Sequence, residues 1–165
     1  EGEAVLDVGC GDGQYVRPLA QVVGPAGRVT AVDRNDQKLA ALRRRLEANG
    51  LSERVELVPA AALDVLAGTP DATFDGALLF DVLQHMDDWE ALLSSLRRAL
   101  RPGGRLLLYP AEAAHPGRVS VHALRDALVR HGFAAPRPHR ARIAHAGSLL
   151  DDTVYRAPRT PTRPA

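Results

Sequence analysis

The sequence predicts an α/β domain with a Rossmann-like, doubly wound fold, in which a seven-stranded and mostly parallel sheet ends in an antiparallel hairpin. Three observations support this prediction. Short apolar runs alternate with segments of helical periodicity over most of the 165 residues, which is the pattern of parallel strands joined by crossover helices. Several runs are apolar nearly throughout, as in strands that are buried on both faces. A glycine-rich turn directly follows the first run, where doubly wound sheets hold a ligand.

The alternating part of the chain is expected to contain five parallel strands and the helices that connect them. The strands are predicted at 3–8, 28–33, 54–59, 74–80 and 105–110. The helices are predicted at 14–23, 35–48, 61–67, 88–100 and 120–131. In the segment 35–48, Leu39, Leu42 and Leu46 share one helical face. Either Asn35 or Asp36 is suited to cap the start of this helix.

The alternation stops after Gly132. Residues 140–146 and 152–157 are predicted to be two strands joined by a turn near Gly147, which would form an antiparallel hairpin at the sheet edge. The segment 158–165 is rich in proline and is expected to be a disordered tail. Residues 1–157 are therefore expected to form one domain, whose first strand has no helices before it to act as a lid.

Composition narrows the classes of protein. A chain with 45% apolar residues can build one core, and its apolar runs are shorter than the ~20 residues of a membrane helix. With no visible signal peptide and one cysteine, we expect a cytoplasmic protein without a metal centre. Residues 1–100 carry a net charge of −6 and residues 101–165 a net charge of +7. The basic part leaves nucleic-acid binding open, but 20 of the 21 basic residues are arginine, which favours a coding bias.

The turn after the first strand and an acidic residue at the end of the second strand predict an adenosine-containing cofactor. Glycines let a ligand approach the backbone because no Cβ intervenes, and Asp33 stands where a carboxylate can accept both ribose hydroxyls. The spacing Gly9-x-Gly11-x-Gly13 differs from the GxGxxG fingerprint of dinucleotide sites. Lys38, the single lysine, belongs neither to a GxxxxGK[ST] phosphate loop nor to a Tyr-x-x-x-Lys pair. Cofactors that carry phosphates are therefore disfavoured.

Four segments carry a resemblance to a known family. VLDVGCGDG (5–13), AVDRN (31–35), FDGALLFDVLQH (74–85) and LRPGGRLLLY (100–109) resemble the successive motifs of class I S-adenosylmethionine-dependent methyltransferases. They are most similar to the small-molecule branch that includes ubiquinone and menaquinone biosynthesis enzymes. The resemblance covers roughly residues 3–110. It implies methyl transfer, with S-adenosylmethionine as the cofactor and S-adenosylhomocysteine as its product.

The resemblance also implies roles at the cofactor. Gly9 and Gly11 would lie against its methionine part, and Asp7 would orient its amino group or the loop. Asp33 would bind the ribose hydroxyls, and Arg34 would flank the adenine.

One position departs from the family pattern. Where the family often has Gly-Asp-Ala after the third strand, this chain has Ala60-Ala61-Ala62. Ala61 cannot accept a hydrogen bond from the adenine amino group, although Ala61 and Ala62 are still assigned to the cofactor site. The loss of such a contact costs on the order of 1–3 kcal/mol, which predicts weaker or less adenine-selective binding. Cys10 is also assigned to this site. No histidine or other base stands near it in the sequence, so we interpret it as a small residue of the turn and not as a nucleophile.

At the methyl group, the resemblance implies that Phe80, Asp81 and His85 border the reaction. His85 is the best candidate for a general base, with pocket shaping or loop capping as the alternative. Asp81 could accept a hydrogen bond from a ligand or cap a helix. Tyr109 ends the fifth strand and belongs either to the core or to the wall of the cleft. His115 follows this strand and could face the same cleft or be solvated. Displacement at a sulfonium needs mainly alignment and exclusion of water, so a catalytic triad is not required.

The acceptor is expected to be a small molecule that is methylated at oxygen, nitrogen or carbon. The [DN]PP[YW] motif of adenine and glutamine methylation and the Pro-Cys nucleophile of cytosine methylation are both missing. Two alternatives stay open: a non-catalytic cofactor-binding or interaction module, and an RNA-modifying methyltransferase. Since the first strand begins by residue 3 or 4, either the chain is shortened, or a homodimer, a partner subunit or an ordered loop supplies the lid, or a large acceptor approaches an open face.

Overall fold

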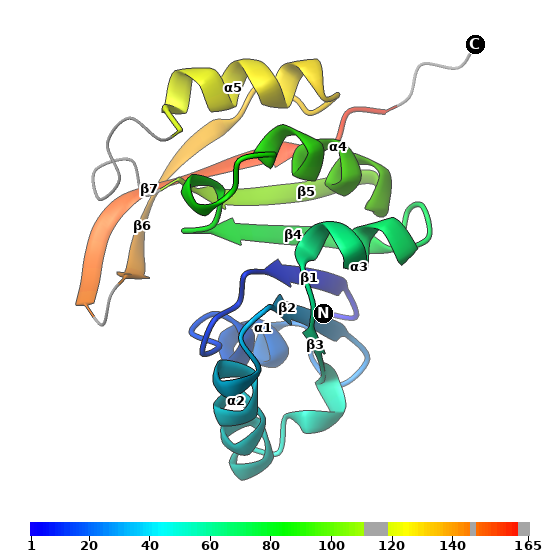
Figure 1. Cartoon of the computed structure of the whole chain (residues 1–165), viewed down its shortest axis with the longest axis vertical. Coiled ribbons are helices and arrows are strands. Elements are labelled where there is room, and N and C mark those ends of the chain that lie inside the picture. The colour runs from blue at the N-terminus through cyan, green and yellow to red at the C-terminus, as the bar shows by residue number, and fades with distance from the viewer. Residues whose placement is uncertain (111–118, 146–147, 162–165) are drawn as a thin grey trace.

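The computed structural model describes residues 1–110, 119–145 and 148–161, and it has the predicted α/β architecture (Figure 1). The elements are, in chain order, β1 (Ala4–Val8), α1 (Val16–Val22), β2 (Arg28–Asp33), α2 (Asp36–Ala48), the 3₁₀ turn η1 (Ser52–Arg54), β3 (Val55–Pro59), α3 (Ala62–Gly68), β4 (Phe74–Phe80), the 3₁₀ turn η2 (Leu83–His85), α4 (Trp89–Ala99), β5 (Leu100–Tyr109), α5 (Val121–Arg130), β6 (Arg137–His145) and β7 (Ser148–Pro158). Asn35 caps α2 by accepting a hydrogen bond from the Lys38 N–H. None of the helices in the described ranges is both long and apolar enough to cross a membrane.

The seven strands lie in the order β3-β2-β1-β4-β5-β7-β6. Strands β1 to β5 are parallel, and β7 pairs antiparallel with both β5 and β6. The predicted mostly parallel sheet with a C-terminal hairpin is therefore confirmed, with β6 and β7 longer than expected. The turn predicted near Gly147 lies outside the described residues. Because the chain runs outward from β1 to β3 and then returns to β4, the strand order reverses between β1 and β4, as the stacked strands in Figure 1 show. Ligands of doubly wound folds bind at the carboxyl ends of strands at such a reversal.

Helices cover both faces of the sheet because side chains alternate along each strand. Leu6 and Val8 of β1 belong to a core cluster that includes leucines of α3, α4 and α5. Val5 belongs to the cluster on the opposite face, with residues of α1 and α2. By the same alternation Asp7 is directed to the face of Val5, so a carboxylate interrupts that face near the carboxyl end of β1.

Strand β5 begins five residues before the predicted position, so this boundary was wrong. Leu100 already pairs with Phe74 of β4, and the pairing resumes with Gly76 and Arg105 after a register shift. A Cβ on Gly104 in this stretch would lie 2.8 Å from the Arg101 carbonyl oxygen. Extra residues in one strand interrupt the two-residue alternation on which strand prediction depends, so the sequence pattern placed the start of this strand only at Arg105.

The C-terminal end is held in place further than predicted. Pro158 is the last residue of β7, although the disordered tail was expected to begin there. The Arg159 N–H donates to the Gly104 carbonyl at 2.7 Å, and the Thr160 N–H donates to the Gly132 carbonyl at 3.1 Å. Backbone hydrogen bonding therefore continues to Thr160, and residues 162–165 lie outside the described ranges.

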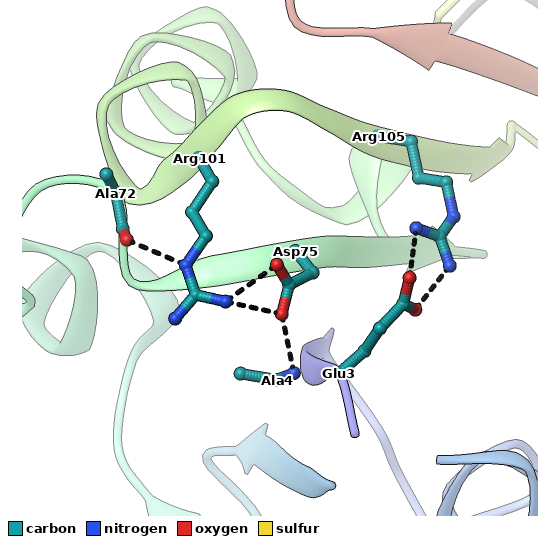
Figure 2. A network of polar contacts seen from close by, with 6 residues as sticks. All are labelled: Glu3, Ala4, Ala72, Asp75, Arg101 and Arg105. Carbon is teal, nitrogen blue, oxygen red and sulfur yellow. Dashed lines mark hydrogen bonds and ion pairs between the residues drawn. The ribbon is translucent and has the colours of Figure 1, made fainter. Parts of the chain in front are cut away.

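Polar contacts join the central strands β1, β4 and β5 at the end of the sheet where these strands begin (Figure 2). The Arg105 guanidinium donates to both carboxylate oxygens of Glu3, one at 2.8 Å. The Arg101 Nη1 donates to both oxygens of Asp75 at 2.7 Å, and Asp75 also accepts from the Ala4 N–H at 2.9 Å. These contacts fix the relative positions of three central strands at the end of the sheet that is opposite the predicted ligand site.

Candidate functional site

A cleft of about 800 Å³ lies at the carboxyl ends of the parallel strands, and its volume is in the range of small-molecule sites. The residues that sequence reasoning assigned to the cofactor and to the methyl group all line it: Asp7, Gly9, Cys10, Gly11, Asp33, Arg34, Ala61, Ala62, Phe80, Asp81 and His85. The fold therefore brings four separate segments together at one place. His115 lies outside the described residues.

The glycines of the first turn serve different purposes. A Cβ on Gly9 would lie 2.6 Å from Cγ2 of Val82, so Gly9 allows the turn after β4 to approach closely. A Cβ on Gly13 would lie 2.2 Å from Cδ1 of Leu42, so Gly13 allows α2 to pack against the turn. Gly11 has a φ of +56° and no atom within 4 Å of its Cβ position. Gly11 is thus the glycine of this turn that opens onto free space in the cleft.

Asp7 is a buried carboxylate with an unmatched oxygen. It is 3% exposed, and its Oδ2 has no hydrogen-bond partner within the described part of the chain. Burial, with a further contribution from the nearby Asp33 charge, raises the pKa of Asp7 to about 7. A buried carboxylate without a partner is unfavourable, and a ligand ammonium group would supply the missing donor. The residues present therefore fit a cofactor that carries a cationic amino acid.

Asp33 is fixed at the end of β2 by two backbone donors. Its Oδ2 accepts from the Gly11 N–H and its Oδ1 from the Asn35 N–H, both at 2.8 Å. These contacts tie the glycine turn to the end of β2. A carboxylate has about four acceptor positions, so two remain for the hydroxyl pair of a ribose. Arg34 is exposed at the next position.

The alanines after β3 leave the adenine end of the cleft without a polar side chain of their own. Ala61 is at the N-cap position of α3, where it makes no side-chain hydrogen bond. Ala61, Ala62 and Leu63 are half-buried and line the cleft. This wall can pack against a flat base, but its side chains cannot recognise the amino group of an adenine.

Three aromatic rings form the wall at the ends of β4 and β5. The rings of Tyr15 and Phe80 meet edge to face with centroids 4.7 Å apart, and those of Phe80 and Tyr109 lie 6.3 Å apart. The Tyr109 hydroxyl donates to Oδ2 of Asp152 in β7 at 3.1 Å. Burial and this contact raise the pKa of Tyr109 to about 12, so Tyr109 stays neutral. Sequence reasoning did not single out Tyr15 or Asp152, because their contacts join segments far apart in the chain.

Several polar side chains also line this end of the cleft, beside Val82 and Met86. Asp81 follows β4 with a φ of +59° and accepts a hydrogen bond from Nε2 of Gln84. His85 is exposed at the end of η2. Asp87 and Asp88, which sequence reasoning did not assign to the site, line the cleft beyond it.

Cys10 lies in the cleft wall but is not activated. The turn before a helix would favour a thiolate, yet α1 begins only at Val16 and the Cys10 side chain is buried. Burial and the charges of Asp7 and Asp33 raise the pKa of this thiol strongly. Cys10 thus remains a neutral, small wall residue at physiological pH.

The cleft carries a negative charge balance. Among its described lining residues, two cations, Arg34 and Lys38, face six aspartates, namely Asp7, Asp12, Asp33, Asp81, Asp87 and Asp88. Such a lining disfavours the phosphates of a dinucleotide and favours an adenosine that carries positive charge. Together with the strand reversal at the cleft, this lining fits the cofactor of the class I S-adenosylmethionine-dependent methyltransferases that the sequence resembles.

Comparison with known proteins gives the family. The chain belongs to the methyltransferase domain family, whose model matches residues 5–104. It is 40% identical over 107 residues to an uncharacterized 37.1 kDa protein in transposon TN4556 of Streptomyces fradiae, which covers 65% of this chain and 30% of that protein. It is 38% identical over 116 residues to a ubiquinone/menaquinone biosynthesis C-methyltransferase of Ectopseudomonas mendocina, which covers 70% of this chain and 44% of that enzyme.

A solved structure shows the same fold. A SAM-dependent methyltransferase from Aquifex aeolicus matches with a TM-score of 0.74 and 23% identity, over 97% of this chain and 84% of that protein. By contrast, the chain spans less than half the length of either curated relative.

Proposed function

We propose that this domain transfers the methyl group of S-adenosylmethionine to a small-molecule acceptor, with carbon as the favoured position of methylation. The buried Oδ2 of Asp7, without a partner in the described chain, supports the cofactor part most directly. The names of the quinone-biosynthesis C-methyltransferases among the relatives support carbon. The aromatic wall of Tyr15, Phe80 and Tyr109 suits a flat organic acceptor.

Each side chain has a separate task in this proposal. When bound, the cofactor supplies an electrophilic methyl group on a sulfonium, whose departure as a neutral thioether needs no acid. Asp33 accepts from the ribose hydroxyls, and Asp7 accepts from the ammonium group. Phe80 and Tyr109 exclude water and limit the directions from which an acceptor approaches.

His85 is proposed as the base. Attack by an acceptor carbon or oxygen releases a proton, and the imidazole of His85, which lines the cleft, can accept it. Because His85 is exposed, the proton can pass directly to water, and no relay through the protein is needed.

A labelled-methyl assay tests the proposal. The protein is incubated with methyl-labelled S-adenosylmethionine and a bacterial extract that is separated into metabolites, RNA and protein. We expect label in the metabolite fraction and its loss with Asp33→Asn. Label in RNA alone would identify the RNA-modifying alternative. Cofactor binding without transfer to any fraction would overturn the enzymatic assignment in favour of a binding module.

A further inference from the structure

Gln84 is a buried polar side chain in an apolar turn. It is 4% exposed, and among the described residues Asp7 is the other polar side chain that is buried to this extent. Its neighbours Val82 and Leu83 belong to the large core cluster. The Gln84 amide donates from Nε2 to Oδ1 of Asp81, while its Oε1 has no partner in the described part of the chain. A leucine at this position would leave no unpaired oxygen buried, so stability of the fold does not favour a glutamine here. The hydrogen bond to Asp81 is the better explanation for the amide.

Asp81 is held in a backbone conformation that side-chain-bearing residues rarely adopt. Its φ is +59°, a region that is unfavourable for residues with a Cβ, although aspartate tolerates it better than most. The Asp81 N–H donates to the Tyr109 carbonyl at 2.9 Å, and its carboxylate accepts from Gln84. Contacts from two directions therefore fix both the backbone and the side chain where Asp81 lines the cleft. Strained residues of this kind persist at functional sites when their surroundings over-determine them.

The position of Asp81 relates it to one atom of the cofactor. Val8 of β1 pairs with Leu79 of β4, so the turns that follow these two strands lie side by side. Under the proposed function, Asp33 accepts from the ribose and Asp7 from the amino group. The sulfonium is the atom that joins these two parts of the cofactor, so it belongs between them, where Asp81 faces the cleft from the β4 side.

We propose that Asp81, oriented by Gln84, supplies a negative charge that raises the affinity of this chain for S-adenosylmethionine relative to its affinity for S-adenosylhomocysteine. The two ligands differ by one methyl group and by the positive charge on sulfur, so a carboxylate near the sulfur gains this extra attraction only with S-adenosylmethionine. After methyl transfer this attraction disappears, which favours release of the product. Gln84 is a positioning residue, since it acts only through the Asp81 carboxylate. This inference rests on the proposed function.

Calorimetric titration with each of the two ligands tests the role of Asp81. The quantity compared is the ratio of the dissociation constants of S-adenosylhomocysteine and S-adenosylmethionine. Asp81→Asn keeps the side-chain shape and the tolerance for positive φ but removes the charge. We expect it to lower the preference for S-adenosylmethionine by about fourfold, as for one charge pair a few ångström apart in water-like surroundings. Asp64→Asn, the same change at an exposed residue of α3 outside the cleft lining, should leave the ratio unchanged.

The positioning role is tested by Gln84→Leu. This variant should fold, because it removes an unpaired buried oxygen, and it should lower the same ratio while S-adenosylhomocysteine binds as before. Added to Asp81→Asn, it should cause no further loss, since Gln84 acts through Asp81. A purely structural glutamine would change both affinities together, which would overturn its role. Should Gln84→Leu not fold, the outcome for Asp81→Asn still decides the main point.

The outcomes separate this inference from the proposed function. An unchanged ratio in Asp81→Asn would overturn the inference and leave the cofactor assignment intact. Absence of binding of either ligand to the unaltered protein would overturn the cofactor assignment itself.

Discussion

Replacing Asp7 by asparagine is expected to stabilise the cofactor-free protein at about pH 8 and to have little such effect near pH 4. The pKa of Asp7 in the fold is raised to about 7 by burial and by the Asp33 charge, so the folded protein holds this proton more tightly than the unfolded chain. The carboxyl group therefore destabilises the fold increasingly as pH rises from about 4 to about 7, and by a constant amount above that. Asparagine carries no charge at any of these pH values.

The magnitude follows from the two pKa values. The pKa rises from 3.8 to about 7, and each pKa unit corresponds to about 1.4 kcal/mol. The pH-dependent part of the stabilisation is therefore at most about 4 kcal/mol. Removing the neighbouring charge with Asp33→Asn should lower the pKa of Asp7 and so reduce the effect.

Urea unfolding at several pH values measures this pH-dependent stabilisation by Asp7→Asn. The difference in unfolding free energy between Asp7→Asn and the unaltered protein should grow from about pH 4 to about pH 8. Asp12→Asn, in the same turn but with a side chain that is 62% exposed, serves as the matched control and should show no such growth. A difference that stays constant with pH would refute the reasoning. The same Asp7→Asn variant should bind S-adenosylhomocysteine more weakly, because it lacks the carboxylate that accepts from the ligand ammonium group. Stability would then be gained at the cost of binding.

Three further outcomes are expected. Ala61→Asp should tighten S-adenosylhomocysteine binding by about tenfold in calorimetry, since it adds an acceptor for the adenine amino group; unchanged affinity would contradict this. Gly13→Ala should lower the unfolding free energy by about 2–4 kcal/mol, because its Cβ would lie 2.2 Å from Leu42; Leu42→Ala should partly relieve this in the double variant, and strict additivity would count against the clash. Glu3→Gln should lower the unfolding free energy by about 1 kcal/mol at neutral pH, because it removes the ion pair with Arg105. The effect is small since both side chains are partly exposed. Arg105 lowers the pKa of Glu3, so this contribution is present above the ordinary pKa of 4.5 and fades as pH falls through the lowered value; a loss that persists in acid would exclude the ion pair as its source.

The overall fold and the position of the cleft could be predicted because both depend on local patterns. Apolar runs mark the strands, and the carboxyl ends of parallel strands meet at one edge. Asp33 and the glycine turn were therefore placed together by topology alone, 20 or more positions apart in the sequence. The start of β5 at Leu100 was missed because extra residues hide the alternation there.

The individual environments within the cleft could not be predicted in this way. The burial that keeps Cys10 protonated depends on how several elements pack around it. The role of Gly13 depends on Leu42, a residue of α2, which is not the next helix in the chain. The contact of Tyr109 with Asp152 joins two strands that pair only in the folded sheet. Nothing in the periodicity of the sequence marks such contacts, because hydrogen bonds between distant side chains follow no repeat.

Calorimetric titration of S-adenosylhomocysteine into the unaltered protein and into Asp33→Asn tests the central claim most directly. The account predicts one site per chain in the unaltered protein and an affinity at least about tenfold weaker in the variant, since the two ribose hydroxyls lose a charged acceptor. No binding to the unaltered protein, or equal affinity in both, would contradict the assignment of this cleft to the cofactor.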